Sequence, residues 1–113
     1  MHAIPELGFE LERTRAFLAN ALSEISVDVD PNRYGRSGLV AVINGEHPGP
    51  TVMVRADMDA LPIEEISARP WKSRISGNSH ACGHDGPMAI GLSVARSLIG
   101  RKHQLPGNVV FCF

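Results

Sequence analysis

The sequence has few aromatic residues, almost no net charge and no long apolar run. One Trp, one Tyr and four Phe are its only aromatic residues, and basic and acidic residues nearly cancel to a net charge of −1. A chain without a basic excess lacks the electrostatic attraction that nucleic acids and anionic membranes require. No apolar run approaches membrane-spanning length, and the first residues lack the pattern of a secretion signal. We therefore expect a protein that binds neither nucleic acid nor a membrane.

Cysteine is also scarce, with only Cys82 and Cys112 in the sequence. The two thiols could pair. The lack of a secretion signal and the histidines around Cys82 instead favour reduced thiols in a cytoplasmic protein. Cys112 lies in an apolar run and is interpreted as a small buried residue. That run ends at Phe113 in what reads as the middle of a strand, so we expect a truncated chain.

The spacing of apolar residues predicts an α/β fold, a mixed sheet with flanking helices. Residues 9–25 and 86–99 show helical periodicity. The β-rich runs are 26–30, 39–43, 51–55 and 109–113. Turn-forming residues between the second and third runs predict an antiparallel hairpin. Residues 56–79 show neither period and predict an irregular loop. The length suits one small domain in which helices pack on a sheet.

A dense group of potential metal ligands occupies residues 80–85, His-Ala-Cys-Gly-His-Asp. Small spacers let the backbone aim several ligands at one point, and alternate residues of an extended stretch face the same side. The helix predicted from residue 86 begins here, and its unpaired N–H groups favour a thiolate at Cys82. Asp85 could cap this helix or accept a hydrogen bond from a ligating imidazole. Alternatively, Cys82 is a buried thiol and His80 and His84 are polar loop residues.

Two carboxylates, Asp57 and Asp59, follow the predicted strand 51–55. The carboxyl ends of strands are where open α/β sheets place their sites, although the pair could also simply end the strand and cap a turn. Weaker candidates are the nearly terminal His2 and the acidic pair at 64–65, which is interpreted as solvated surface. His47 and His103 are interpreted as surface histidines, and none of these groups is assigned a function.

Three motifs, in this order, resemble the signatures of the M20 amidohydrolases. The resemblance is to the branch that contains hippurate hydrolases, N-acyl-amino-acid amidohydrolases and indoleacetyl-amino-acid hydrolases. The motifs span nearly the whole chain. They are Pro-Glu-Leu-Gly-Phe-Glu at 5–10 with Arg-Thr at 13–14, Pro-Gly-Pro-Thr-Val at 48–52 with Arg-Ala-Asp-Met-Asp-Ala-Leu-Pro-Ile at 55–63, and His-Ala-Cys-Gly-His-Asp-Gly at 80–86.

The resemblance implies a metal-dependent amidase whose catalytic domain holds two divalent ions, zinc or manganese. Cys82 and His84 would bind metal, and Asp59 would be a supporting carboxylate. Neighbouring groups or possible ligands would be His80, Asp85 and Asp57. The ions would polarise the amide carbonyl of a small N-acyl amino acid and acidify a water, whose proton a glutamate takes. The products would be a carboxylic acid and an amino acid, and the full-length form could be a homodimer.

The sequence departs from the family pattern in composition and in extent. Pro87 stands where the family usually has histidine, and Ser79 where it usually has methionine. Proline fits a first helical turn but cannot bind metal. After the strand matching 109–113, the family continues with a Gln-Pro-Ala-Glu-Glu segment that supplies the general base and another ligand, then with further histidines and a lid domain. These are absent from this sequence, so we expect residues 1–113 to be the N-terminal portion of the catalytic domain and inactive alone.

Two other interpretations stay open. The chain could be a non-catalytic remnant, or it could be a small zinc-stabilised metal-binding module unrelated to peptidases. A zinc ion that supports the fold would stay bound through dialysis, and its removal would unfold the chain. Hydrolysis of hippurate or of an acetylated amino acid would distinguish an enzyme from a remnant.

Overall fold

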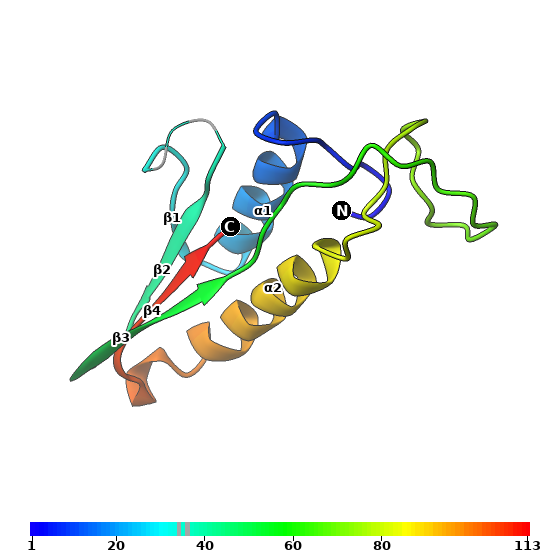
Figure 1. The fold of residues 1–113 in the computed structure, drawn as a ribbon. Helices are drawn as coiled ribbons and strands as arrows, with labels where there is room; N and C mark the ends of the chain where they lie inside the picture. Colours follow the sequence, from blue (N-terminus) through cyan, green and yellow to red (C-terminus); the bar gives the residue numbers. More distant parts are fainter. Residues whose placement is uncertain (34, 36) are drawn as a thin grey trace.

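The computed structural model describes residues 1–33, 35 and 37–113, which form two α-helices, one short 3-10 helix and a four-stranded sheet (Figure 1). Helix α1 spans Glu12–Glu24, helix α2 spans Asp85–Ile99 and the 3-10 helix η1 spans Lys102–Gln104. The strands are β1 (Asp28–Asp30), β2 (Val40–Asn44), β3 (His47–Arg55) and β4 (Pro106–Cys112). The predicted mixed α/β class is confirmed. No helix in the described ranges has the length and apolarity to cross a membrane.

The strand order is β1-β2-β4-β3, so the predicted hairpin between β2 and β3 is wrong. Strand β4 lies between them, antiparallel to β2 and parallel to β3. Strands β3 and β4 are joined through α2, which makes a βαβ crossover.

Two glycines let β4 enter between β2 and β3, although only two residues link those strands. The Gly45 N–H donates to the Gly107 carbonyl over 2.9 Å, and a Cβ on Gly45 would lie 2.2 Å from that same oxygen. A Cβ on Gly107, whose φ is +78°, would lie 1.8 Å from the Pro50 carbonyl oxygen. Only glycine permits this approach, and the spacing that resembles a hairpin turn is instead the point where a third strand enters.

The core lies between one face of the sheet and the two helices. Alternate residues of β2 and β4 face it, as expected for strands with one buried face. The core cluster joins these strand residues to both helices, which lie on the same side of the sheet in Figure 1. Its fully buried members include Leu18 and Leu22 of α1, Met88 and Ala95 of α2, and Ala41, Ile43 and Phe111 of the sheet.

The first motif, residues 5–10, connects α1 to the segment that follows β3. The Glu6 carboxylate accepts the N–H of Arg13 over 3.0 Å and the N–H of Thr14 over 2.7 Å, which satisfies two free donors at the start of α1. The residue at the N-cap position, Leu11, makes no side-chain cap. The Glu6 carbonyl also accepts the N–H of Ala60 over 2.7 Å. This glutamate therefore holds the helix start beside the chain that carries Asp59.

Replacing Glu6 with alanine should remove the cap and lower the free energy of unfolding by about 1 kcal/mol, the usual cost of losing a helix cap. Urea unfolding followed by circular dichroism measures this loss. The matched control is Glu10→Ala, an exposed glutamate of the same motif, which should change stability by less than about 0.5 kcal/mol. Equal losses in the two variants would contradict the capping role.

Candidate metal centre

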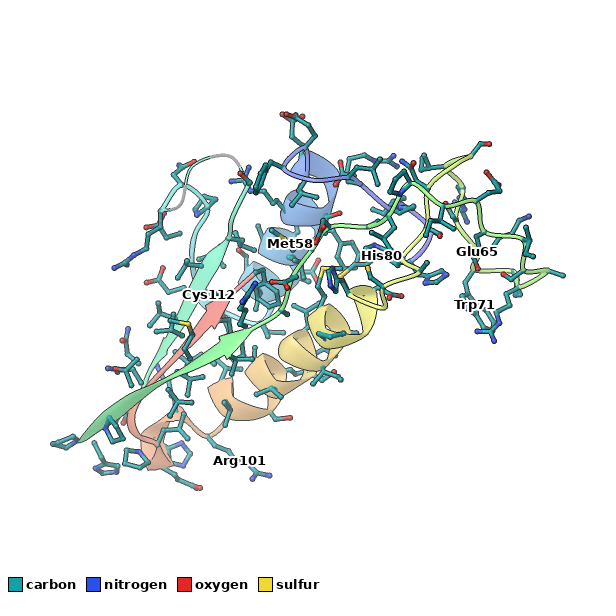
Figure 2. All side chains as sticks on the ribbon, in the orientation of Figure 1. Met58, Glu65, Trp71, His80, Arg101 and Cys112 are labelled. Carbon is teal, nitrogen blue, oxygen red and sulfur yellow. The ribbon has the colours of Figure 1, made fainter. Side chains whose placement is uncertain are left out.

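The candidate centre lies where the segment after β3 meets the segment before α2. Between these two segments the chain runs out through a long loop, residues 62–78. The loop is closed at its base by two backbone hydrogen bonds between Leu61 and Ser79, of 2.9 and 3.0 Å. Closing the loop brings Asp59 and the residues from His80 onward together. Figure 2 shows His80 where the loop meets α2, and Trp71 on the part of the loop farthest from the sheet.

Cys82 and His84 both approach Asp59. The Nδ1 atom of His84 lies 2.9 Å from the Asp59 carbonyl oxygen and 3.0 Å from its carboxylate Oδ1, and the Cys82 Sγ lies 3.7 Å from the same carbonyl. Both oxygens can only accept, so Nδ1 carries the proton. The Nε2 lone pair of the neutral ring is then free to bind a metal. A carboxylate that fixes a histidine in this tautomer is the usual support of a metal-binding imidazole.

The donor atoms suit zinc, but they make only part of a site. A thiolate and an imidazole are typical zinc ligands, and a catalytic zinc normally has three protein ligands. Within residues 1–33, 35 and 37–113, no group of three or more His, Cys, Asp or Glu side chains is arranged to hold an ion. The side chains of His84 and Asp59 are 31% and 40% exposed, and Cys82 is exposed, so further ligands have room to approach. Both cysteines are free thiols.

The other predicted site residues have different surroundings. His80 is only 4% exposed, and burial lowers the pKa of its imidazole, so the ring is neutral at neutral pH. Neither of its ring nitrogens has a hydrogen-bond partner in the described part of the chain. Asp57 pairs with Arg55 over 2.9 Å and faces a groove of about 470 Å³ that Asp59 also lines. Pro87 is exposed in the first turn of α2.

Asp85 does not cap α2, and its hydrogen-bond partner is neither Cys82 nor His84. It is the first residue of α2, after His84 at the N-cap position, and the helix has no side-chain cap. Its carboxylate instead accepts a hydrogen bond from His2 Nδ1 over 2.7 Å. The carboxylate that holds His84 is Asp59, three residues before the loop begins.

The sequence analysis assigned no function to His2 or Glu65. His2 lies between two carboxylates, since its Nε2 is 3.2 Å from Glu65 Oε2 while its Nδ1 contacts Asp85. Hydrogen bonds from the Ser67 hydroxyl and then the Ser73 N–H lower the pKa of Glu65 to about 2. The hydrogen bond to Asp85 raises the pKa of His2. These partners are 63 and 83 residues from His2, and no local pattern in the sequence signals such contacts.

Comparison with known proteins finds one family and many relatives. The profile of Peptidase family M20/M25/M40 matches residues 53–113. YhaA of Bacillus subtilis is 46% identical over 109 residues, covering 96% of this chain and 27% of YhaA. The N-acetyldiaminopimelate deacetylase of Listeria innocua is 35% identical over 113 residues, covering 100% of this chain and 30% of the deacetylase.

A solved structure shares the fold described above. The YXEP protein of Bacillus subtilis, described as a dinuclear metal-binding peptidase from the M20 family, superposes with a TM-score of 0.94 at 37% identity. That match covers 99% of this chain and 31% of YXEP. The chain thus spans about three-tenths of the length of the relatives it matches.

The hydrogen bonds at Asp59 predict that neutral His84 is the Nδ1–H tautomer, with Nε2 unprotonated. Long-range nitrogen–proton NMR correlations in the metal-free chain identify the protonated nitrogen. His47, which is exposed and whose ring has no hydrogen-bond partner among the described residues, serves as the reference and should show a mixture of tautomers. A spectrum in which the His84 proton lies on Nε2 would contradict the geometry at Asp59.

Proposed function

Since the chain belongs to peptidase family M20/M25/M40, we propose that it forms the N-terminal portion of the catalytic domain of a metal-dependent amidohydrolase. The proposed reaction is hydrolysis of the amide bond of an N-acyl amino acid. We assign two metal ligands to this chain, Cys82 and His84, with Asp59 as their supporting carboxylate. His80, Asp85 and Asp57 remain possible neighbours of the centre rather than assigned ligands.

One observation carries this proposal: the thiol of Cys82 and the imidazole of His84 converge on Asp59 from the chain before α2. These residues come from two of the three motifs, and the third motif contributes Glu6, which holds Ala60 next to Asp59. The convergence involves residues 23 and 25 positions apart in the sequence, so local chain geometry alone does not produce it. The solved relative of known metal content is described as dinuclear.

In the proposed centre, divalent ions would polarise the amide carbonyl and acidify a water molecule at neutral pH. The described residues have simpler tasks. Asp59 holds the proton of His84 on Nδ1, which keeps Nε2 available and fixes the plane of the ring. Cys82 is exposed three residues before α2, and its sulfur would bind an ion as the thiolate. We assign the general base to a glutamate outside these residues, as the family resemblance implies.

The proposed substrate is a small N-acyl amino acid. The matched relatives include proteins named as N-acetyldiaminopimelate deacetylase and as N-acetylcysteine deacetylase. Resemblance to the hippurate hydrolase branch adds a benzoyl group as a candidate beside acetyl. The groove next to Asp59, about 470 Å³, is within the range of small-ligand sites and is lined by Phe9, Asp57 and Arg55 among others.

The proposal predicts weak metal binding that depends on Cys82, His84 and Asp59. Cobalt(II) added to the chain should give a thiolate charge-transfer band, and Cys82→Ser should abolish it. Asp59→Ala should lower the affinity about 10- to 100-fold, the usual cost of losing a carboxylate behind a ligating histidine. Because Asp57 pairs with Arg55, Asp57→Ala should change the affinity much less. Isothermal titration gives the affinities; a band that persists in Cys82→Ser would contradict the assignment.

The same proposal expects no hydrolysis of hippurate or acetylated amino acids by this chain alone, with manganese or zinc added. Turnover above the buffer rate would show that these residues already contain a complete site, contrary to the partial centre assigned here. The alternative of a zinc-stabilised module makes the opposite metal prediction. In that case zinc would resist dialysis and its removal would unfold the chain. The exposure of Cys82, His84 and Asp59 argues against such a closed structural site.

A further inference from the structure

His2 bridges two parts of the molecule, the 62–78 loop and the start of α2, that share no other side-chain hydrogen bond or ion pair among the described residues. Its Nδ1–H donates to Asp85 Oδ2 over 2.7 Å, and its Nε2–H donates to Glu65 Oε2 over 3.2 Å. The three side chains are only 31%, 23% and 15% exposed. Because both acceptors are carboxylates, a ring with two N–H donors satisfies both. Removing the imidazole would leave two carboxylates facing each other without a cation.

One end of this bridge is the loop of residues 62–78, which Glu65 holds from the inside. The Glu65 carboxylate accepts the Ser67 hydroxyl over 2.5 Å and the Ser73 N–H over 2.7 Å, so it ties the two sides of the loop together. Glu64 makes a similar link to Ser76 and to the N–H of Gly77. The loop therefore has internal structure, and two contacts attach it to the N-terminal segment. The Ala3 carbonyl accepts the N–H of Arg74 over 3.0 Å, and the His2 side chain contacts Glu65.

The outer part of the loop is exposed. Ile66 is 95% exposed and Trp71 is 56% exposed, with the Arg69 guanidinium 5.9 Å from the centre of the Trp71 ring. Lys72 and Arg74 are exposed as well. Trp71 therefore does not anchor the loop from beneath. The anchoring contact is instead the polar one between Glu65 and His2.

The other end of the bridge is the head of α2. Asp85 is the first residue of that helix and directly follows His84, which is the proposed metal ligand. The chain here turns through Gly83 at a φ of +83°. No neighbouring atom lies within 4 Å of the position that a Cβ on Gly83 would take, so nothing packs on the turn at that point. A fixed Asp85 carboxylate therefore restrains the backbone one residue beyond His84 and three residues beyond Cys82. The His80 ring lies beside the His2 imidazole, with ring centroids 6.3 Å apart.

We propose that His2 is a positioning residue: it clamps the 62–78 loop to the head of α2 and thereby holds the Cys82–His84 segment in place. Only the second part of this inference, the effect on the Cys82–His84 segment as a metal site, rests on the proposed function. The clamp itself is a statement about the loop and Asp85, and it can be tested without any metal. The two nitrogens of His2 have separate partners, so the two halves can also be tested separately by substitution.

The test uses two conservative variants of His2 in the whole chain. The side-chain amide of asparagine lies near the position of Nδ1, so His2→Asn keeps a donor for Asp85 and loses the reach to Glu65. The amide of glutamine lies near the position of Nε2, so His2→Gln keeps a donor for Glu65 and loses Asp85. His2→Ala removes both links, and His103→Ala is the control because His103 is exposed in η1.

The first readout is tryptic cleavage in the loop after Lys72 and Arg74, followed by mass spectrometry in metal-free buffer. Release of the loop should raise the cleavage rate in His2→Asn and His2→Ala about tenfold, because cleavage follows the population of the open loop. His2→Gln and His103→Ala should be cleaved at the rate of the unchanged chain. Circular dichroism confirms that each variant is folded, and the Asn and Gln pair decides the outcome if His2→Ala unfolds.

The second readout is the cobalt–thiolate band of Cys82, which a change in loop mobility alone would not alter. The band should be retained in His2→Asn and weakened in His2→Gln and His2→Ala. If His2→Asn and His2→Gln behave alike in both measurements, or if neither differs from the unchanged chain, the proposal is wrong. If the unchanged chain itself shows no band, the proposed metal function fails, while the cleavage measurement still decides whether His2 clamps the loop.

Discussion

The hydrogen bonds from His84 to Asp59 connect two segments that the sheet does not hold together. Asp59 lies after the last residue of β3, and His84 lies immediately before α2; the whole 62–78 loop separates them. A single nitrogen of His84, Nδ1, makes this connection because the Asp59 carbonyl and carboxylate are both within hydrogen-bond distance of it. The contact leaves Nε2 of His84 as the ring nitrogen available to an ion in the proposed centre.

The rest of the described structure positions that contact. The βαβ crossover of β3, α2 and β4 places the end of β3 and the start of α2 at the same edge of the sheet, the edge where α/β proteins place their sites. Glu6 adds a second restraint, because its carboxylate caps α1 while its carbonyl pairs with Ala60. His2 adds a third restraint through Asp85, the residue after His84. Polar contacts of Glu6 and His2 thus restrain the segments that carry Asp59 and His84, while the apolar core lies between the helices and the sheet.

Local features of this molecule could be predicted from sequence, and long-range ones could not. The helices and most strands were predicted because apolar spacing reports a buried face. Cys82 and His84 could be named as candidate ligands because they lie two residues apart. The hairpin prediction failed because the decisive contact, between Gly45 and Gly107, joins residues far apart in the chain. The same limit hid the cap by Glu6, which lies outside its helix, and the roles of His2 and Glu65. Asp85 looked like a helix cap because it precedes a helix, but its partner is at the other end of the sequence.

The central claim is that a divalent ion on this chain would be held by one sulfur and one imidazole nitrogen. X-ray absorption spectroscopy at the zinc edge, on the chain loaded with one equivalent of zinc, measures this directly. The account predicts one sulfur at about 2.3 Å together with nitrogen or oxygen ligands at about 2.0 Å. A first shell without sulfur would show that Cys82 does not bind the ion, and the assignment of the centre to the Cys82–His84 segment would be wrong.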